Sequence, residues 1–271
     1  MELLLVNCSI TSIAEMTFAN ANRVNHLDLS LNLLTSINTK TFAGLKYLKR
    51  LNLKGNLINE IFPYTFSGLM LNTLDLSLNL LTSIPTGTFA GLTYFTRLNL
   101  KGNRIRELLP KTFSGLMLDK LDISNNDIAI VHSNAFGNVT IKELAFHEND
   151  IQTFDSDIFK GLQNVEKITA PAFKFCCYKP SSDCLTCLPD EDVFSSCTDL
   201  MRNSFLRSLL WAIGGSSLLG NACTIIYRSI YDRASIRKGH GMFITNLAAS
   251  DFLMGVYMII LAIADASFRD R

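Results

Sequence analysis

The stretch HLDLSLN at residues 26–32 returns five more times along the chain, at intervals of 23–24 residues. The copies are RLNLKGN (50–56), TLDLSLN (73–79), RLNLKGN (97–103), KLDISNN (120–126) and ELAFHEN (143–149). Each copy has mostly leucine at its second and fourth positions, so these side chains lie on one side of a short strand and their neighbours on the other. The frame therefore predicts a stack of short strands with one buried and one open face.

Two further positions recur in register with these strands. Each frame ends on asparagine, whose amide we expect to satisfy backbone groups of the turn in neighbouring coils. Phenylalanine follows at a fixed offset, and we expect its rings to fill the convex side of the stack. The asparagines are Asn32, Asn56, Asn79, Asn103, Asn126 and Asn149, with Cys8 at this place in a partial first copy. The phenylalanines are Phe18, Phe42, Phe66, Phe89, Phe113, Phe136 and Phe159.

This pattern resembles the leucine-rich repeat, whose copies stack because no coil can bury its apolar face alone. The resemblance implies an α/β solenoid with a curved parallel sheet, built from about seven repeats over residues 1–164. Residues 24–70 and 71–117 are nearly the same sequence, which indicates a duplicated pair of repeats. Solenoids of this shape usually serve as binding surfaces.

The outward residues of the predicted strands form what we call the concave face. Adjacent strands lie ~4.8 Å apart, so its aspartates recur on about every second strand, with basic rows between them. Such a face suits a charged peptide; alternatively, its charges neutralise one another and the face is only solvated. The candidate ligand-binding residues are Asp28, Asp75, Asp122, Glu143, Arg50 and Arg97.

Cysteines gather in residues 165–204, which we interpret as a hinge after the repeats. Outside the cell, such clustering predicts disulfides that close the end of a solenoid core, with a pairing that the sequence leaves open. Zinc binding at Cys184 and Cys187 is disfavoured because no second Cys or His pair lies at a fitting distance, so no metal site is expected. Cys8 and Cys223 are expected to be apolar fillers. The disulfide candidates are Cys176, Cys177, Cys184, Cys187 and Cys197.

Residues 205–227 and 242–264 are almost continuously apolar and long enough to cross a bilayer as helices. The loop 228–241 between them is basic and the segment before them is acidic, so the loop is predicted to be cytoplasmic and the repeats extracellular. Residues 265–271 would then begin an extracellular loop. Two sequons, at Asn7 and Asn138, fit this location as glycosylation sites. The alternative, two buried helices of a soluble domain, lacks an amphipathic pattern to support it.

The two apolar stretches carry polar residues in a family-specific order. Gly220-Asn221, followed by Asn246-Leu247-Ala248-Ala249-Ser250-Asp251, resembles the first two helices of rhodopsin-like G-protein-coupled receptors. The resemblance implies that Asn221 helps to tie the helices together. It also implies that Asp251, a costly charge at bilayer depth, lines a polar pocket that holds sodium only in a complete seven-helix bundle.

Leu253-Met254-Gly255-Val256-Tyr257 and the Cys176-Cys177-Tyr178 run narrow this resemblance to leucine-rich-repeat receptors for protein hormones. Relaxin-family peptide receptors are the most similar, and glycoprotein-hormone receptors come next. The implied partners are a peptide or protein hormone, membrane lipid and a heterotrimeric G protein, at the plasma membrane. Helices three to seven would lie beyond residue 271, so this chain is expected to be a receptor fragment that does not signal alone.

Other classes of function have less support. An adhesion or decoy protein, anchored by two spans and unable to signal, is the main alternative. An enzyme is not expected, because the histidines are scattered and accompany no nucleophile or phosphate-binding loop. A formal charge of +1 gives no basis for nucleic-acid binding. No cofactor is expected. The histidines are His26, His132, His147 and His240.

Overall fold

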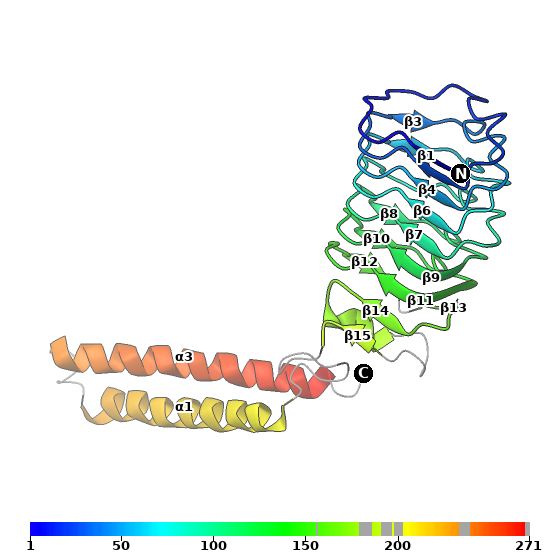
Figure 1. Ribbon diagram of the computed structural model, residues 1–271. Helices are drawn as coiled ribbons and strands as arrows, with labels where there is room; N and C mark the ends of the chain where they lie inside the picture. The colour runs from blue at the N-terminus through cyan, green and yellow to red at the C-terminus, as the bar shows by residue number, and fades with distance from the viewer. Residues whose placement is uncertain (156, 179–185, 191–196, 198–202, 233–238, 269–271) are drawn as a thin grey trace. The chain divides into compact units, whose positions relative to one another are not determined.

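The computed structural model describes residues 1–155, 157–178, 186–190, 197, 203–232 and 239–268. The chain divides into two compact units, Met1–Asp190 and Glu191–Arg271. The first consists of short strands joined by turns and the second of two long helices (Figure 1).

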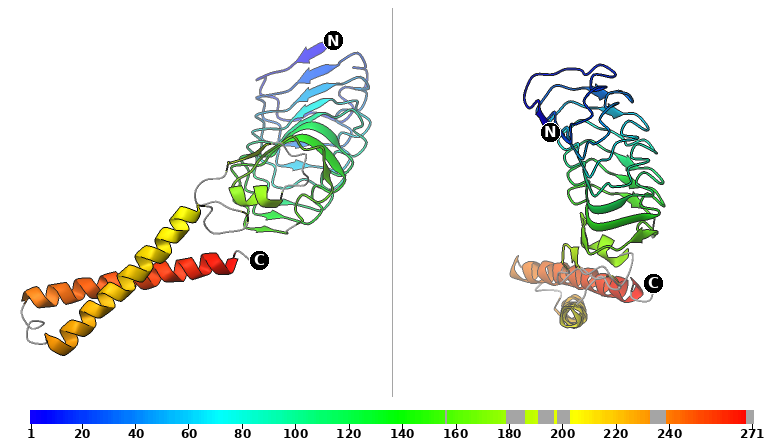
Figure 2. Two further views of the ribbon diagram at one scale, coloured as in Figure 1. Left: turned by 90° about the horizontal axis from the view of Figure 1, so that it is seen from below. Right: turned by 45° about the vertical axis from the view of Figure 1, so that its right-hand side comes forward.

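The first unit is a solenoid, as predicted, and Figures 1 and 2 show its coils stacked along one axis. Its main sheet is wholly parallel and has the strand order β1-β2-β4-β6-β7-β9-β11-β14-β15, with β13 also paired to β11. These strands are β1 (Glu2–Leu4), β2 (His26–Asp28), β4 (Arg50–Asn52), β6 (Thr73–Asp75), β7 (Arg97–Asn99), β9 (Met117–Asp122), β11 (Val139–Ala145), β13 (Leu162–Gln163), β14 (Lys167–Thr169) and β15 (Thr186–Leu188).

Two smaller sheets run along another side of the same coils. Their strand orders are β3-β5 and β12-β10-β8, and their strands are two residues long. The strands are β3 (Ser36–Ile37), β5 (Glu60–Ile61), β8 (Glu107–Leu108), β10 (Ile130–Val131) and β12 (Thr153–Phe154).

The asparagine ladder joins each coil to the next, as the sequence predicted. The amide nitrogen Nδ2 of Asn56 donates to the carbonyl of Leu53 in its own coil and to that of Leu29 in the preceding coil, at 2.9 and 3.0 Å. Its Oδ1 accepts from the backbone N–H of Leu34, at 3.1 Å. One buried side chain thereby satisfies three backbone groups that would otherwise lie unpaired in the core. Asn79, Asn103 and Asn126 repeat the arrangement.

The phenylalanine column is confirmed as well. The seven rings are buried, and successive ring centroids lie 5.9–6.3 Å apart from Phe18 to Phe159. Between this column and the strands lie the inward leucines, of which Leu27, Leu51 and Leu74 are at most 1% exposed. The core is thus continuous from coil to coil, although each coil is too thin to have a core of its own.

The sheet continues into the cysteine-rich segment that the sequence assigned to a hinge. Beyond Asn164, strands β14 and β15 add to the sheet, and a 3₁₀ helix (η1, Phe173–Tyr178) packs Phe175 into the core. A disulfide between Cys176 and Cys187 ties η1 to β15. The repeat frame fails here because the last apolar coil is covered by a cross-linked cap and not by another repeat.

The other cysteines differ in bonding and exposure. Cys177 and Cys197 are also disulfide-bonded, whereas Cys184 lies outside the described residues. Because Cys187 is bonded to Cys176, it cannot serve as a thiolate ligand for zinc. The expectation that Cys8 is a buried filler is wrong, since its side chain is exposed. Cys8 follows β1, the outermost strand of the described sheet. Cys223 is exposed on its helix.

The second unit is a pair of helices, α1 (Ser204–Tyr231) and α3 (Gly239–Phe268). Small residues allow their close approach: a Cβ atom added at Gly255 would lie 3.0–3.1 Å from backbone atoms of α1. Besides Asp265, the buried residues of α3 are four small residues that recur every seven positions, a spacing that suits close packing of helices. These are Gly241, Ala248, Gly255 and Ala262.

Both helices are long and apolar enough to cross a membrane. Most of their surface is exposed in the second unit, whereas core helices of a soluble domain are buried. The soluble-domain alternative therefore does not fit the structure. Residues 233–238 of the predicted cytoplasmic loop and residues 269–271 of the predicted outer loop lie outside the described residues.

We predict that Asn79→Ala locally destabilises two coils. The variant leaves the carbonyls of Leu53 and Leu76 and the N–H of Ile58 without their partner, at a cost of about 2 kcal/mol or more. Hydrogen exchange of the full chain in detergent, followed by mass spectrometry over residues 52–60, should accelerate by about thirtyfold. Asn59→Ala, at an exposed position, is the control and should change exchange little. Equal exchange in both variants would contradict a structural role for the ladder.

Candidate ligand-binding face and the polar residues of the helix pair

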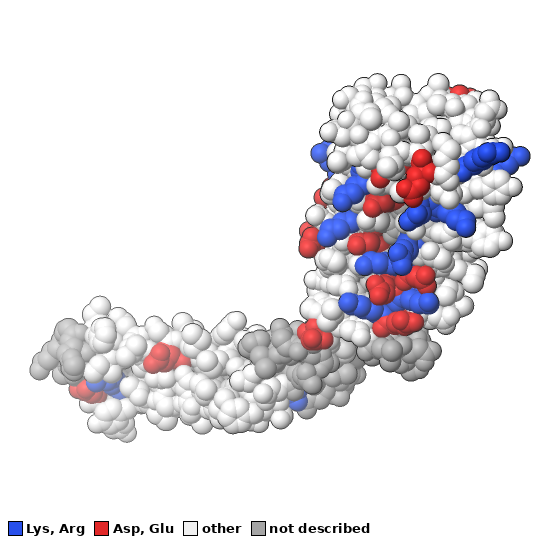
Figure 3. Space-filling model, viewed as in Figure 1, with Lys and Arg blue, Asp and Glu red and all other residues white. Residues whose placement is uncertain are grey.

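The strand register places the predicted columns of the concave face side by side. The first column pairs His26, Arg50, Thr73, Arg97, Lys120 and Glu143 in consecutive strands. The second pairs Asp28, Asn52, Asp75, Asn99, Asp122 and Ala145. Acidic and basic side chains alternate along the axis on this face of the solenoid (Figure 3). All six candidate ligand-binding residues thus share one surface.

The carboxylate of Asp28 is engaged in holding the turn that follows its strand. Its Oδ1 accepts from the hydroxyl and backbone N–H of Ser30, at 2.6 and 2.9 Å, and its Oδ2 accepts from Asn52 Nδ2 at 3.0 Å. Partial burial raises the pKa of Asp28, but these hydrogen bonds and the nearby charge of His26 outweigh it and hold the pKa below 3.8. Asp28 is therefore a structural acceptor as well as a surface charge.

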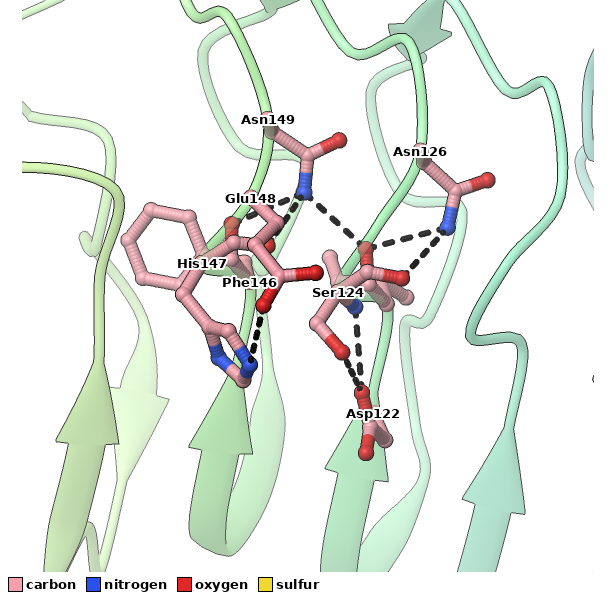
Figure 4. A network of polar contacts seen from close by, with 8 residues as sticks. Asp122, Ser124, Asn126, Phe146, His147, Glu148 and Asn149 are labelled. Atoms are coloured by element: carbon pink, nitrogen blue, oxygen red, sulfur yellow. Dashed lines mark hydrogen bonds and ion pairs between the residues drawn. The ribbon is translucent and has the colours of Figure 1, made fainter.

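Asp75 and Asp122 repeat this arrangement with small differences. Asp75 accepts from the N–H of Ser77 at 2.8 Å and from Asn99 Nδ2 at 3.2 Å. Asp122 accepts from the hydroxyl and N–H of Ser124, and Figure 4 shows this pair beneath the amides of Asn126 and Asn149. The strand after Asp122 carries Ala145 where the earlier copies have asparagine. Asp122 therefore lacks the cross-strand amide that Asp28 and Asp75 have.

Ion pairs take up part of the remaining charge. Lys120 Nζ lies 3.7 Å from Glu143, and an Arg50 Nη2 atom lies 3.6 Å from Glu2. At the edge of the face, Lys142 donates to Asp119 at 2.8 Å, which lowers the pKa of Asp119 and raises that of Lys142. These pairs are exposed and contribute little to stability. They do partly neutralise the charges that they join, so a ligand meets mainly the charged side chains outside these pairs.

The described histidines lie apart from one another, as the sequence indicated. His26 is 3.4 Å from Glu2, His132 is 3.1 Å from Glu107, and His147 is 3.9 Å from Glu148. The last pair is visible in Figure 4. The side chain of His240 lies outside the described residues. Each of the three thus lies within ion-pair distance of a surface glutamate.

In the helix pair, Asn221 reaches α3 through Ser217. Asn221 Nδ2 donates to the carbonyl of Ser217 at 2.8 Å, and the Ser217 hydroxyl donates to the backbone carbonyl of Asp251 at 2.7 Å. The carboxylate of Asp251 itself is exposed on the pair. An alkali cation needs several oxygen ligands, and these two helices bring no group of three or more acidic, His or Cys side chains together among the described residues. The sodium pocket that the resemblance implies stays a prediction.

An ion pair that sequence reasoning missed joins the start of α1 to the end of α3. Arg207 Nε lies 2.9 Å from Asp265 Oδ2, and the Asp265 side chain is fully buried. The two residues are 58 positions apart, and no periodicity links an isolated arginine to an isolated aspartate over that distance. Their common position near the same end of two antiparallel apolar helices was the only available signal.

Comparison with known proteins agrees with this architecture. A model described as "Leucine rich repeat" matches residues 1–58, 32–71 and 70–128, and a "BspA type Leucine rich repeat region (6 copies)" matches residues 110–227. The chain belongs to the leucine-rich-repeat family. The second match runs into α1, which is a continuous helix, so the repeats of this leucine-rich-repeat protein end before the match does.

Its curated relatives include membrane receptors. The chain is 42% identical to G-protein coupled receptor GRL101 of Lymnaea stagnalis over 41% of this chain and 10% of that protein. It is 28% identical to the lutropin-choriogonadotropic hormone receptor of Mus musculus (49% and 16%) and 30% identical to relaxin receptor 2 of Canis lupus familiaris (45% and 16%). The chain thus spans only 10–16% of the length of these relatives.

A solved structure supports the solenoid. A crystal structure of a TLR13–ssRNA13 complex is similar with a TM-score of 0.55 and 30% identity, over 59% of this chain and 23% of that chain. The covered share of this chain corresponds in size to the repeat unit. The comparison therefore bears on the fold of the leucine-rich repeats.

We predict that part of the stability of the repeats depends on the ionised form of Asp28. Its pKa is lower in the folded chain than in the unfolded chain, so its contribution is full above the unfolded value and disappears as pH falls through the folded value, below 3.8. Asp28→Asn should lower stability at pH 6 by about 1 kcal/mol and flatten its dependence on pH below 4. Hydrogen exchange of residues 26–34 measures both. Asp127→Asn, at an exposed position, should leave the pH dependence unchanged.

We also predict that Asp265→Ala destabilises the helix pair by about 3 kcal/mol, because it removes the buried carboxylate beside the Arg207 guanidinium. Thermal unfolding of the full chain in detergent, read from Trp211 fluorescence on α1, should show a lower Tm. The double variant Arg207→Met/Asp265→Leu should recover most of the loss. Asp251→Asn, at an exposed carboxylate on the same helix, is the control. A single variant as stable as the double one would rule out this role.

Proposed function

We propose that this chain is part of a G-protein-coupled receptor for a peptide or protein hormone. It would comprise the ectodomain that captures the hormone and the first two transmembrane helices. Support comes from the combination of a leucine-rich-repeat solenoid, a disulfide-closed end and two helices able to cross a membrane. Relatives named as a G-protein coupled receptor, a lutropin-choriogonadotropic hormone receptor and a relaxin receptor add to it. A heterotrimeric G protein is the intracellular partner under this proposal.

The proposed location is the plasma membrane, with the repeats outside the cell and the loop 228–241 in the cytoplasm. The distribution of basic and acidic residues around the helices supports this orientation. Disulfides at Cys176 and Cys187 also favour an oxidising compartment. Asn7 and Asn138 are both exposed and could carry glycans without displacing core residues.

The hormone class that we place first is the relaxin type, with glycoprotein hormones second. The run Leu253–Tyr257 supports this order, while the relaxin and lutropin-choriogonadotropic receptors match at similar identity, 30% and 28%. In either case the first contact would be made on the concave face. Its alternating charged rows, fixed by the parallel register, are the observation on which the proposal rests.

The proposal predicts that charge reversal on this face changes hormone affinity. In the complete receptor, Asp75→Lys/Asp122→Lys should weaken a cationic hormone several-fold or more, through loss of charge complementarity. Arg50→Glu/Arg97→Glu should do the same for an anionic one. Binding of a panel of labelled peptide and glycoprotein hormones at low salt measures the effect. Lys111→Glu/Lys160→Glu, at exposed positions away from the strands, is the matched control.

If neither charge-reversal variant changes the affinity for any hormone that binds, capture by the concave face is contradicted. Loss of binding in the control pair as well would show a general electrostatic effect instead. Because Asp75 also holds a turn, its variant is first compared with the parent chain in hydrogen exchange of residues 73–79.

A further inference from the structure

A row of large apolar side chains is exposed beside the concave face. Tyr47, Met70, Tyr94 and Met117, which we call the Tyr–Met stripe, are 62%, 42%, 59% and 67% exposed. Each directly precedes the buried residue that opens its coil, so the four occupy equivalent positions in consecutive coils. Such a contiguous exposed row differs from the single apolar residues that are normal on protein surfaces.

The stripe is hollowed at one place. Tyr47 and Tyr94 stand on either side of Met70 and, with Lys49 and Asn72, line a hollow of about 350 Å³. This size lies near the lower end of the range for small-ligand sites, ~300–1,000 Å³. The stripe does not repeat the arrangement one coil pair further, because Thr140 takes the place of a third tyrosine beside Met117. Two aromatic walls and a flexible methionine floor are therefore specific to this position.

The charge around the hollow is positive. Lys49 lines it, no carboxylate does, and Arg97 follows Tyr94 by three residues on β7. Among the described residues, Lys49 forms no ion pair, whereas the charge of Arg97 acts on Asp119 and helps to lower the pKa of that carboxyl. The nearby acids are engaged elsewhere: Asp75 accepts from Ser77 and Asn99, and Asp119 pairs with Lys142. The positive charge of Lys49 thus borders an apolar hollow that no carboxylate lines.

We propose that this hollow binds a large apolar side chain of an acidic polypeptide segment, with carboxylates beside that side chain facing Lys49 and Arg97. Tyrosine and methionine are both enriched at protein interfaces. Tyrosine presents a large apolar area at low cost in conformational freedom, and the flexible methionine adapts its shape to the partner. The assignment of this segment to the hormone rests on the proposed function; the hollow as a binding site does not.

The acidic and basic residues of this surface have different roles. The aspartates of the concave face already accept two or three hydrogen bonds from the fold, as in Asp28 and Asp75. A ligand that competes for them must disturb a turn. An acidic ligand group can approach Lys49 without breaking a contact of the fold, so the face and the hollow together favour an acidic segment.

The test observes the floor of the hollow directly. The full chain is labelled with ¹³C-methyl methionine in detergent micelles, and the Met70 and Met117 signals are assigned from Met70→Leu and Met117→Leu. Three nonapeptides are titrated: GSEEFEESG, GSKKFKKSG and GSEESEESG. We expect the first to shift the Met70 methyl signal, through the ring current of its phenylalanine, and to leave Met117 unmoved. The other two should bind at least about fivefold more weakly.

Variants complete the test. Tyr94→Ala and Lys49→Glu should each weaken the first peptide by about fivefold or more, whereas Met117→Ala, in the same stripe but outside the hollow, should change its affinity by less than twofold. Both tested side chains are exposed, so folding should be unaffected, and unchanged thermal unfolding verifies this.

Three results would overturn the inference: an unmoved Met70 signal, equal binding of the three peptides, or a shift of Met70 with chain concentration alone, which would place a second copy there. If charge reversals on the concave face alter hormone affinity but the Met70 methyl signal does not shift, the proposed hollow fails and the proposed function stands. If Met70 responds while hormone affinity ignores the concave face, the proposed function fails and the hollow remains a site.

Discussion

The hydrogen bonds of the buried asparagines are the constraint on which the rest of the repeat unit depends. Each asparagine bonds to carbonyls in two coils and accepts an N–H from the earlier one, so it fixes the distance and the register between neighbours at once. Leucines and phenylalanines supply the apolar driving force but tolerate small slips. The amide does not, because a slip leaves buried backbone groups unpaired. The columns of the open face inherit their alignment from this ladder.

The alignment of the strands decides which charged side chains of the open face are hydrogen-bonded within the fold. Aspartates on β2 and β6 each meet an asparagine of the next strand, and each also holds the serine turn after its own strand. The negative charge is thereby drawn into the fold, while lysines and arginines on the intervening strands and their edges stay exposed. A surface that appears balanced when residues are counted is therefore unequal in what it offers to a ligand.

Features with a period were predictable from the sequence, and features made by single residues were not. The strand frame, the asparagines and the phenylalanine column each recur six or seven times, so chance resemblance was averaged out. The cap beyond Asn164 was not predicted as part of the sheet. The frame keeps only a strand-like start at β14, with Phe173 where asparagine belongs, and β15 has no repeat frame and is tied to η1 by the disulfide of Cys176 and Cys187. Cys8 was misjudged since a repeat frame says nothing of whether a coil has a neighbour on its outer side.

The two carboxylates of α3 show how depth and partner decide the meaning of a charge in an apolar helix. Asp265 is fully buried and has Arg207 at 2.9 Å, so the pair of helices satisfies it. Asp251 lies fourteen residues earlier, near the middle of the span, and its carboxylate is exposed on the same pair. Facing lipid there would cost roughly 2.5–3.5 kcal/mol. In a bilayer, such a carboxylate would need protein or water beside it, which the interior of the receptor bundle proposed above would supply.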